Sequence, residues 1–262
     1  MQLPGFPCRR FPLAALAVLC LLLAGISSAS AQLLIKPDDH WRYSLGAGGS
    51  VSSGNSSSQS VNITADALKA TERDKWTLYG RLLYGESDDE TTADQANAGG
   101  RYDRELTQAW FAFGLADWLR DRPANLSNRW SASTGLGYHL IKEDPGFWDV
   151  FAGLGYTHDA LIVPTVVSDE LRSSYGRAEL LFGEESQYQL TGSTTVKQRL
   201  VIFPNLDDTS NFRGVLDTSL AVAMTERFNL TASLGYRYNS DPGAALRKVD
   251  LLFVTGITVK IE

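Results

Sequence analysis

Residues 228–239 read FNLTASLGYRYN, and apolar and polar side chains alternate along the whole segment. The apolar positions begin at Phe228 and recur at every second residue as far as Tyr238, while Asn, Thr, Ser, Gly and Arg lie between them. A period of two residues is typical of a β-strand whose two faces meet different surroundings. Residues 129–140 and 249–261 repeat the pattern, so we expect an all-β fold.

The alternation recurs from Trp41 to the end of the chain and predicts about 12 strands. We place these strands at residues 41–52, 59–70, 75–86, 95–105, 107–118, 127–141, 147–158, 171–184, 186–198, 210–224, 227–239 and 246–261. Most of them reach the roughly 9–11 residues that a tilted membrane strand requires. The expected fold is therefore a transmembrane antiparallel up-and-down β-barrel.

The connections between the strands alternate in length. Tight, charged turns are predicted at residues 72–74, 104–106, 144–146, 184–185 and 225–226. Longer loops are predicted at residues 52–58, 86–95, 120–128, 158–170, 203–210 and 239–245. Short turns at one end and longer loops at the other are typical of a bacterial outer-membrane barrel. Acidic runs at residues 88–90, 169–170 and 207–208 are interpreted as solvated loop residues, and divalent cations bridging to lipopolysaccharide are the alternative.

Residues 1–31 have the features of a secretory signal peptide. Arg9 and Arg10 precede an apolar run at residues 13–26, and residues 29–31 read ASA, a small-x-small cleavage pattern. An uncleaved anchor helix is the alternative. Cleavage would leave residues 32–262 as the barrel domain, without Cys8 or Cys20, so disulfides and cysteine chemistry are not expected there. The full chain has a formal net charge of −6, which makes nucleic-acid binding improbable.

Aromatic residues lie near the ends of the apolar rows. This spacing predicts two interfacial aromatic girdles, although aromatic residues are common in strands of every kind. The predicted girdle residues are Trp41, Trp76, Tyr84, Trp130, Tyr138, Trp148, Tyr156, Phe228, Tyr236 and Tyr238.

The opposite face of the strands carries charges of both signs and is predicted to line the lumen. The charged network is predicted to contain Arg42, Asp66, Arg81, Arg129, Arg177, Glu179, Arg213, Asp217 and Arg237, with Lys197 and Asp250 on the same face. Buried ions without partners are costly, so either these side chains pair across strands and fill the lumen or water occupies it. We favour a filled or narrow lumen, because small barrels leave little room inside.

The sequence offers little material for catalysis. Its three histidines are His40, His139 and His158, too few for an imidazole metal cluster. His139 shares the predicted inward face with Ser131 and Ser133, so the chain lacks an outward Ser–His pair that could meet lipid. The Gly-Leu-Gly-Tyr repeats at residues 135–138 and 153–156 are interpreted as strand interiors with inward glycines, not as phosphate loops. We therefore predict no enzyme activity, no cofactor and no metal site.

Three segments carry a resemblance to a known family. They are residues 41–51 followed by Ser53-Gly54-Asn55-Ser56, residues 129–138 with their Gly-Leu-Gly-Tyr repeat, and Leu234-Gly235-Tyr236 leading to Asp241-Pro242. In these the chain resembles the domain of unknown function 481 family, whose members are often called salt-induced outer membrane proteins. The resemblance implies an outer-membrane barrel of Gram-negative bacteria without an established activity or catalytic residues. The chain departs from the usual barrel pattern at its end, where residues 259–262 read VKIE and lack a terminal aromatic residue.

The predicted function is that of a non-enzymatic barrel in the outer membrane of a Gram-negative bacterium. It would act as a narrow pore or a structural envelope protein linked to salt or osmotic stress. The expected partners are outer-membrane lipid, lipopolysaccharide and the barrel-assembly machinery, with no nucleic acid and no obligate protein partner. The first alternative is a soluble periplasmic β-barrel or sandwich that binds a small apolar ligand. A lipid hydrolase dependent on His139 is the second alternative.

Overall fold

The computed structural model describes residues 37–52, 58–88, 90–167, 170–208, 210–242 and 247–261. The predicted signal peptide and its cleavage site lie outside these residues. Within the described ranges, no helix is long and apolar enough to cross a membrane.

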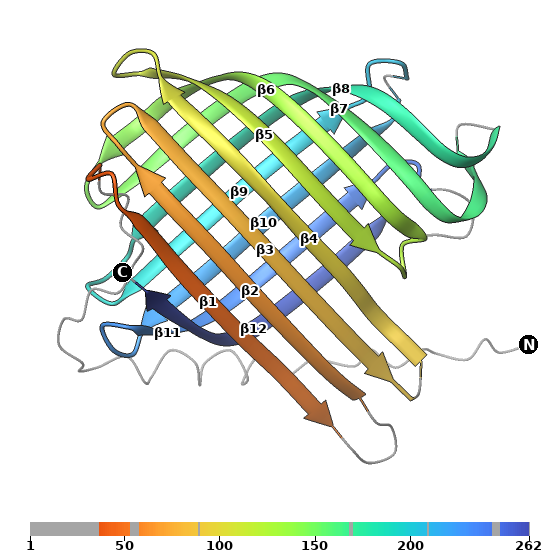
Figure 1. The fold of residues 1–262 in the computed structure, drawn as a ribbon, viewed down its shortest axis with the longest axis horizontal. Helices are drawn as coiled ribbons and strands as arrows, with labels where there is room; N and C mark the ends of the chain where they lie inside the picture. Colours follow the sequence, from red (N-terminus) through yellow and green to blue (C-terminus); the bar gives the residue numbers. More distant parts are fainter. Residues whose placement is uncertain are drawn as a thin grey trace, which may run out of the picture.

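The described residues form twelve strands in one closed antiparallel barrel, as Figure 1 shows. The strands are β1 (Trp41–Ser52), β2 (Ser58–Ala70), β3 (Asp74–Ser87), β4 (Glu90–Glu105), β5 (Trp110–Asp121), β6 (Leu126–Glu143), β7 (Gly146–Val167), β8 (Glu170–Gln189), β9 (Thr194–Pro204), β10 (Phe212–Ala223), β11 (Phe228–Asn239) and β12 (Val249–Ile261). Each strand pairs with the next in sequence, and β12 pairs with β1. The predicted all-β barrel of about 12 strands is confirmed.

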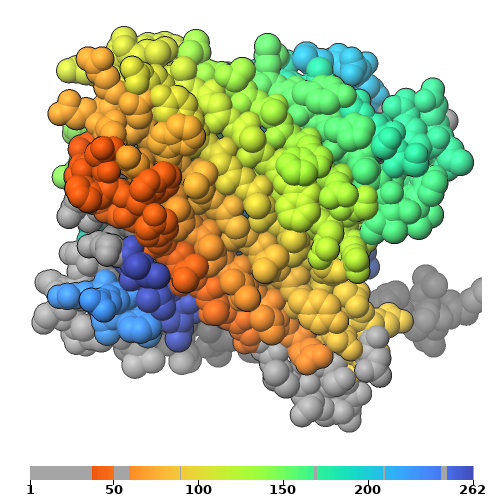
Figure 2. Space-filling view, in the orientation of Figure 1, coloured from red at the N-terminus to blue at the C-terminus, as the bar shows by residue number. Residues whose placement is uncertain are grey.

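The two faces of each strand differ in exposure, as the alternation requires. On β1, Trp41 and Tyr43 are exposed on the outer wall, whereas Arg42 and Ser44 between them are buried inside. On β11, Leu234 is exposed and pairs with Phe253 of β12, which is also exposed. Apolar rows therefore cover the outside of the barrel, and the outer wall over β1 to β4 forms a continuous surface (Figure 2).

Two of the predicted long loops are wrong, because they continue as strand. The expected loop at residues 158–170 belongs almost entirely to β7 and β8, which project as a long hairpin at one end of the barrel (Figure 1). Asn125 explains part of this extension. Its side chain donates to the Val163 carbonyl at 2.8 Å and accepts from the Val163 amide at 2.9 Å, and so replaces the neighbouring strand that β7 lacks there. The expected loop at residues 86–95 is likewise reduced to a tight connection between Ser87 and Glu90.

The predicted turn at residues 184–185 is also wrong, because β8 continues to Gln189. Both carboxylates find partners on other strands instead of solvent. Glu184 faces outward and accepts hydrogen bonds from Trp148 Nε1 at 3.1 Å and Gln198 Nε2 at 3.0 Å. Glu185 faces inward and pairs with Arg101 at 3.4 Å. A charged pair indicates a turn only when no cross-strand partner is available.

Candidate functional site

The inward side chains of the barrel form the candidate site, and they divide into three layers on one wall. We call the barrel end where β1 begins and β12 ends the terminal end, and the opposite end the far end. One ionic cluster lies toward each end, and an apolar layer separates them. The remaining inward surface, carried by parts of β2, β3 and β9 to β12, is packed differently and is described last.

The far cluster joins four predicted lumen residues to Asp159 of β7; the four are Arg129, Arg177, Glu179 and Arg213. Arg129 contacts both carboxylate oxygens of Asp159, at 2.5 and 2.6 Å, and Arg177 reaches the same carboxylate at 3.1 Å. Glu179 lies between Arg177 at 2.9 Å and Arg213 at 2.6 Å. The exposed fraction is 0% for Asp159 and 2% for Glu179, so both carboxylates depend on these arginines.

Thr157 and Asp159 belong to the far cluster although the charged prediction did not include them. Thr157 Oγ1 donates to Glu179 at 2.7 Å, and its hydroxyl also contacts the Ser131 hydroxyl at 3.2 Å. The alternation of strand faces could have identified both residues, because they lie on the same inward face of β7 as Gly155. The predicted strand ends at residue 158, which places Asp159 in a loop.

The terminal-end cluster was missed by the sequence prediction. Arg101 pairs with Asp103 at 2.7 Å and with Glu185 at 3.4 Å, and Lys75 pairs with Asp103 at 3.3 Å. Arg101 and Asp103 are two residues apart on β4, so parity alone could have placed both inside. Their partners on β3 and β8 follow only from the way the barrel closes.

His139 lies at the same end, between carboxylates. Its Nδ1 is 2.7 Å from Asp149, and its Nε2 is 3.1 Å from Glu105, which also pairs with Lys142. The Ser131 hydroxyl is hydrogen-bonded to Thr157 toward the far end. The structure thus places His139 in an ionic network and not beside the serines of its own strand.

An apolar layer fills the lumen between the two clusters. The layer consists of Phe111, Phe113, Phe151, Leu181 and Val201, which point inward from β5, β7, β8 and β9. The Arg101 guanidinium lies 4.9 Å from the Phe113 ring centre and 4.8 Å from that of Phe151, a cation–π arrangement. The pattern of charged residues does not indicate this layer. In the sequence its phenylalanines are ordinary positions of an alternating strand.

Inward-facing glycines leave space for these aromatic rings. A Cβ atom at Gly137 would lie 2.1 Å from Cζ of Phe111, and one at Gly183 would lie 2.5 Å from Cε2 of Phe151. Real side chains do not approach so closely, so glycine at these positions makes room for the aromatic layer. This is the crowding that the Gly-Leu-Gly-Tyr segments had suggested.

The opposite wall is more open. Its ion pairs, Arg81 with Asp66 at 2.5 Å and Arg237 with Asp217 at 2.7 Å, keep side-chain exposures between 32% and 48%. Lys197 on β9 is also exposed and shares its inward face with Ser219 on β10. Because these side chains point inward, their exposure means that space remains inside the barrel along this wall.

Two predicted lumen residues lie near the barrel rims. Arg42 faces inward at the terminal end and donates hydrogen bonds to Asp38, which precedes β1. These bonds, reinforced by the His40 amide, lower the pKa of Asp38 from 3.8 to about 2. Asp250 lies at the far end of β12 opposite Arg237 and is exposed.

The predicted girdle residues all lie on the outer wall. Trp41, Trp76, Tyr138, Trp148 and Phe228 lie toward the terminal end of their strands, and Tyr84, Trp130, Tyr156, Tyr236 and Tyr238 lie toward the far end. Neighbouring rings that the prediction omitted extend both rows. Trp110 stands edge-on to Tyr138 at 5.0 Å near the terminal end, and Phe212 lies 5.1 Å from Tyr238 near the far end.

A family model described as "Protein of unknown function, DUF481" matches residues 45–261. The chain belongs to this family. The resemblance seen in the sequence is therefore confirmed. This DUF481 member is 26% identical over 198 residues to the uncharacterized protein YdiY of Escherichia coli (strain K12), covering 76% of this chain and 74% of that protein.

Two solved structures are similar to this DUF481 barrel at low identity. The translocator domain of the autotransporter NalP from Neisseria meningitidis is 12% identical with a TM-score of 0.45, covering 85% of this chain and 87% of that one. The NanC porin is 11% identical with a TM-score of 0.43, covering 84% of this chain and 97% of that one.

Proposed function

We propose that this protein is a non-enzymatic barrel of the Gram-negative outer membrane with a narrow, water-filled passage along one side of its lumen. The observation that carries the proposal is the contrast between the two inner walls. Asp159 and Glu179 are sealed within the far cluster, whereas the inward pair of Arg237 and Asp217 is about half exposed. An ion pair exposed inside a closed barrel needs water beside it.

The outer wall supports the membrane location. Large apolar side chains on several strands, such as Leu154, Leu251 and Phe253, are more than half exposed. A soluble protein rarely exposes apolar rows of this extent, whereas lipid tails cover them without cost. The soluble ligand-binding alternative would need the long apolar rows of the strands to face the interior, whereas these rows face outward.

The passage should respond to charge on the open wall. Asp66 pairs with Arg81, and Asp217 pairs with Arg237, so these four charges largely balance one another. Lys197 of β9 adds an exposed cation on the same inward face. We expect Lys197 to favour anions in the passage, because a fixed charge in a confined pore raises the local concentration of the opposite sign.

The proposed function also requires that the chain be exported, inserted into the outer membrane and expressed under suitable conditions. Residues 1–31 would direct export, the barrel-assembly machinery would insert the chain, and lipid and lipopolysaccharide would cover the aromatic and apolar rows. Induction by salt or osmotic stress belongs to the same proposal. Transcript and protein levels after an osmotic upshift test that last part independently of the pore.

Planar-bilayer conductance of the refolded barrel tests the passage. We expect small single-channel steps, and we expect Lys197→Gln to shift the reversal potential in a KCl gradient toward cation selectivity. Arg227→Gln is the matched control, because Arg227 is exposed in the turn before β11. Conductance no greater than that of bare lipid would favour the second candidate, a structural envelope protein with a closed lumen.

Fractionation tests the location separately. A membrane barrel should require detergent for extraction and should change its gel mobility on heating. Recovery in a periplasmic extract without detergent would reject the membrane location and the pore together.

A further inference from the structure

The wall between β1 and β12 is paired over only part of its height. The two strands pair from Tyr43 with Ile261 to Ala47 with Ile257. Along its other edge, β1 pairs with β2 over its whole length, and β12 pairs with β11 from Val249 to Val259. Residues 48–52 of β1 and 249–256 of β12 therefore lie outside the ladder that joins these two strands. The pairing of β8 with β9 is also partial and runs from Phe182 to Gln189 of β8.

The end of the β1–β12 ladder shows where the two strands part. A Cβ atom at Gly256 would lie 2.8 Å from the Ala47 carbonyl oxygen and 3.3 Å from Gly48 Cα, so the strands still touch there. The last pair of the ladder is Ala47 with Ile257. Beyond this point β1 remains paired with β2, β12 remains paired with β11, and each of the two strands turns an unpaired edge toward the other.

An open strand edge is costly in hydrocarbon, because its N–H and C=O groups have no water to bind. Water from the lumen can satisfy those groups only if the lumen reaches the seam. The open wall of the lumen does reach it, since Arg237 on β11 lies opposite Asp250 on β12. The seam thus joins the hydrated part of the interior to the outer wall.

The lining beside the seam is amphipathic. Leu252 faces inward but is 40% exposed. Its Cβ lies 3.8 Å from the Cβ position built on Gly235, and the Asp217 carboxylate lies 3.6 Å from the same point. Leu251 and Phe253, the outward neighbours of Leu252, are each 67% exposed on the outer wall. Apolar surface therefore runs from the outer wall around the edge of β12 to the Arg237–Asp217 pair.

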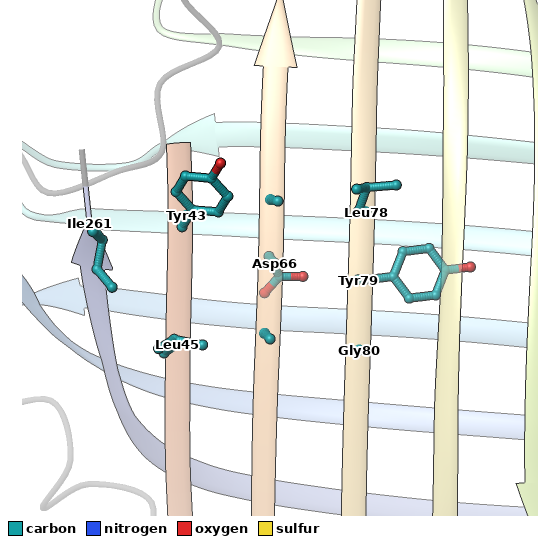
Figure 3. A pocket seen from close by; sticks show the side chains of 9 residues that line it. Tyr43, Leu45, Asp66, Leu78, Tyr79, Gly80 and Ile261 are labelled. Carbon is teal, nitrogen blue, oxygen red and sulfur yellow. The ribbon is translucent and has the colours of Figure 1, made fainter. Parts of the chain in front are cut away.

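The outer wall also offers an apolar approach to the seam. A hollow of about 370 Å³ crosses the paired part of the seam and the adjoining strands (Figure 3). Tyr43 and Leu45 of β1, Leu78 of β3 and Ile261 of β12 surround it, and Ala65, Ala67 and Gly80 keep its floor low. A hydrocarbon chain fits such a surface better than a polar solute does.

We propose that the seam is a lateral opening through which a single-chain anionic amphiphile passes between the membrane and the lumen. Its acyl chain lies along Phe253 and Leu252, and its carboxylate or phosphate head group meets Arg237. This inference rests on the proposed membrane location, but it does not require ion conductance. A barrel that conducts no ions can still admit an acyl chain, so the two proposals fail separately.

Engineered cysteine pairs test whether the seam is open. Residues 32–262 contain no native cysteine, so each pair reports alone. The control pair is Ala47→Cys with Ile257→Cys, which are direct partners. The test pair is Val51→Cys with Phe253→Cys, which the same register would bring together if the seam were closed. A disulfide needs Cα atoms within about 7 Å.

We expect the oxidised control to form an intramolecular disulfide, and we expect the test pair to form none while a long bis-maleimide still links it. A test-pair disulfide as complete as the control would show a closed seam and overturn the proposal. Disulfide-linked dimers as the main product would also overturn it, because a second copy would then cover the edge.

Photolabelling in liposomes tests the occupant. A palmitate that carries a photoreactive group close to its carboxylate should label Leu252, and Arg237→Gln should lower that labelling several-fold while Arg227→Gln leaves it unchanged. A matching lysophosphatidylglycerol probe distinguishes a phosphate head group from a carboxylate. Labelling by both probes that is confined to the outward residues Leu251 and Phe253 would overturn the proposal.

Discussion

Arg129 and Asp159 form a two-pronged ion pair inside the barrel, with Nε and Nη2 of the arginine 2.5 and 2.6 Å from the two carboxylate oxygens. The carboxylate of Asp159 has no exposed surface and is shared with Arg177. The pair therefore connects β6, β7 and β8 near the far end. Asp159 is fully buried at this end of the wall, whereas the ion pairs of the opposite wall are partly exposed.

Asp159→Asn should destabilise the barrel strongly. The substitution leaves Arg129 and Arg177 buried beside a neutral amide, and breaking a buried pair in this way costs about 3–5 kcal/mol. Asp217→Asn is the matched control, because its pair with Arg237 is exposed and should be worth about 1 kcal/mol or less. Urea unfolding in liposomes measures both. Equal losses would contradict the difference between the two walls.

Leu234→Arg and Ser233→Arg should differ, because the two residues face opposite sides of β11. Leu234 is exposed on the outer wall near the middle of the strand, so an arginine there should cost about 2–4 kcal/mol. Ser233 pairs with Ser219 on the inward face, where the open wall can accept a charged side chain. The free energy of unfolding in lipid checks the difference, and similar losses would mean that the face assignment is wrong.

Phe113→Ala should both destabilise the barrel and widen its lumen. Phe113 is buried, packs edge-on against Phe151 at 5.5 Å and lies under the Arg101 guanidinium. Truncation of a buried Phe costs about 3–5 kcal/mol. We expect larger conductance steps than in the wild type, whereas Phe182→Ala on the outer wall should leave them unchanged. Unaltered conductance in Phe113→Ala would mean that the aromatic layer does not limit the passage.

Asp38 should titrate far below an ordinary aspartate. Hydrogen bonds from Arg42 lower its pKa from 3.8 to about 2, so the folded state favours the ionised carboxylate. A lowered pKa means that this contact stabilises the fold above the ordinary aspartate value and is lost as the pH falls through about 2. Carboxyl carbon NMR should show the midpoint near the lower value, and Arg42→Gln should return it toward 3.8. An unchanged midpoint in that variant would exclude Arg42 as the cause.

The positions of most strands, and the side to which each residue points, were predictable because they depend on neighbours along the chain. The alternation from Phe228 to Tyr238 requires only that successive side chains point to opposite faces. Where the prediction was wrong, a partner distant in sequence had overridden a local signal. Asn125 binds Val163 in a strand where the sequence predicts a loop, and Glu185 pairs with Arg101 in a strand where the sequence predicts a turn.

The sequence by itself determined that the chain is a two-faced all-β barrel, and it identified most of the charged residues that point inward. Only the tertiary structure decided which of them meet: that Lys75, Arg101 and Glu185 gather at the terminal end, that a phenylalanine layer fills one wall, and that β1 and β12 part above Gly48. The physical reason is that the side of the strand to which a side chain points alternates with a period of two residues, so it can be read from the sequence. Partnership depends on the stagger between strands in the closed barrel, which brings together residues far apart in the chain.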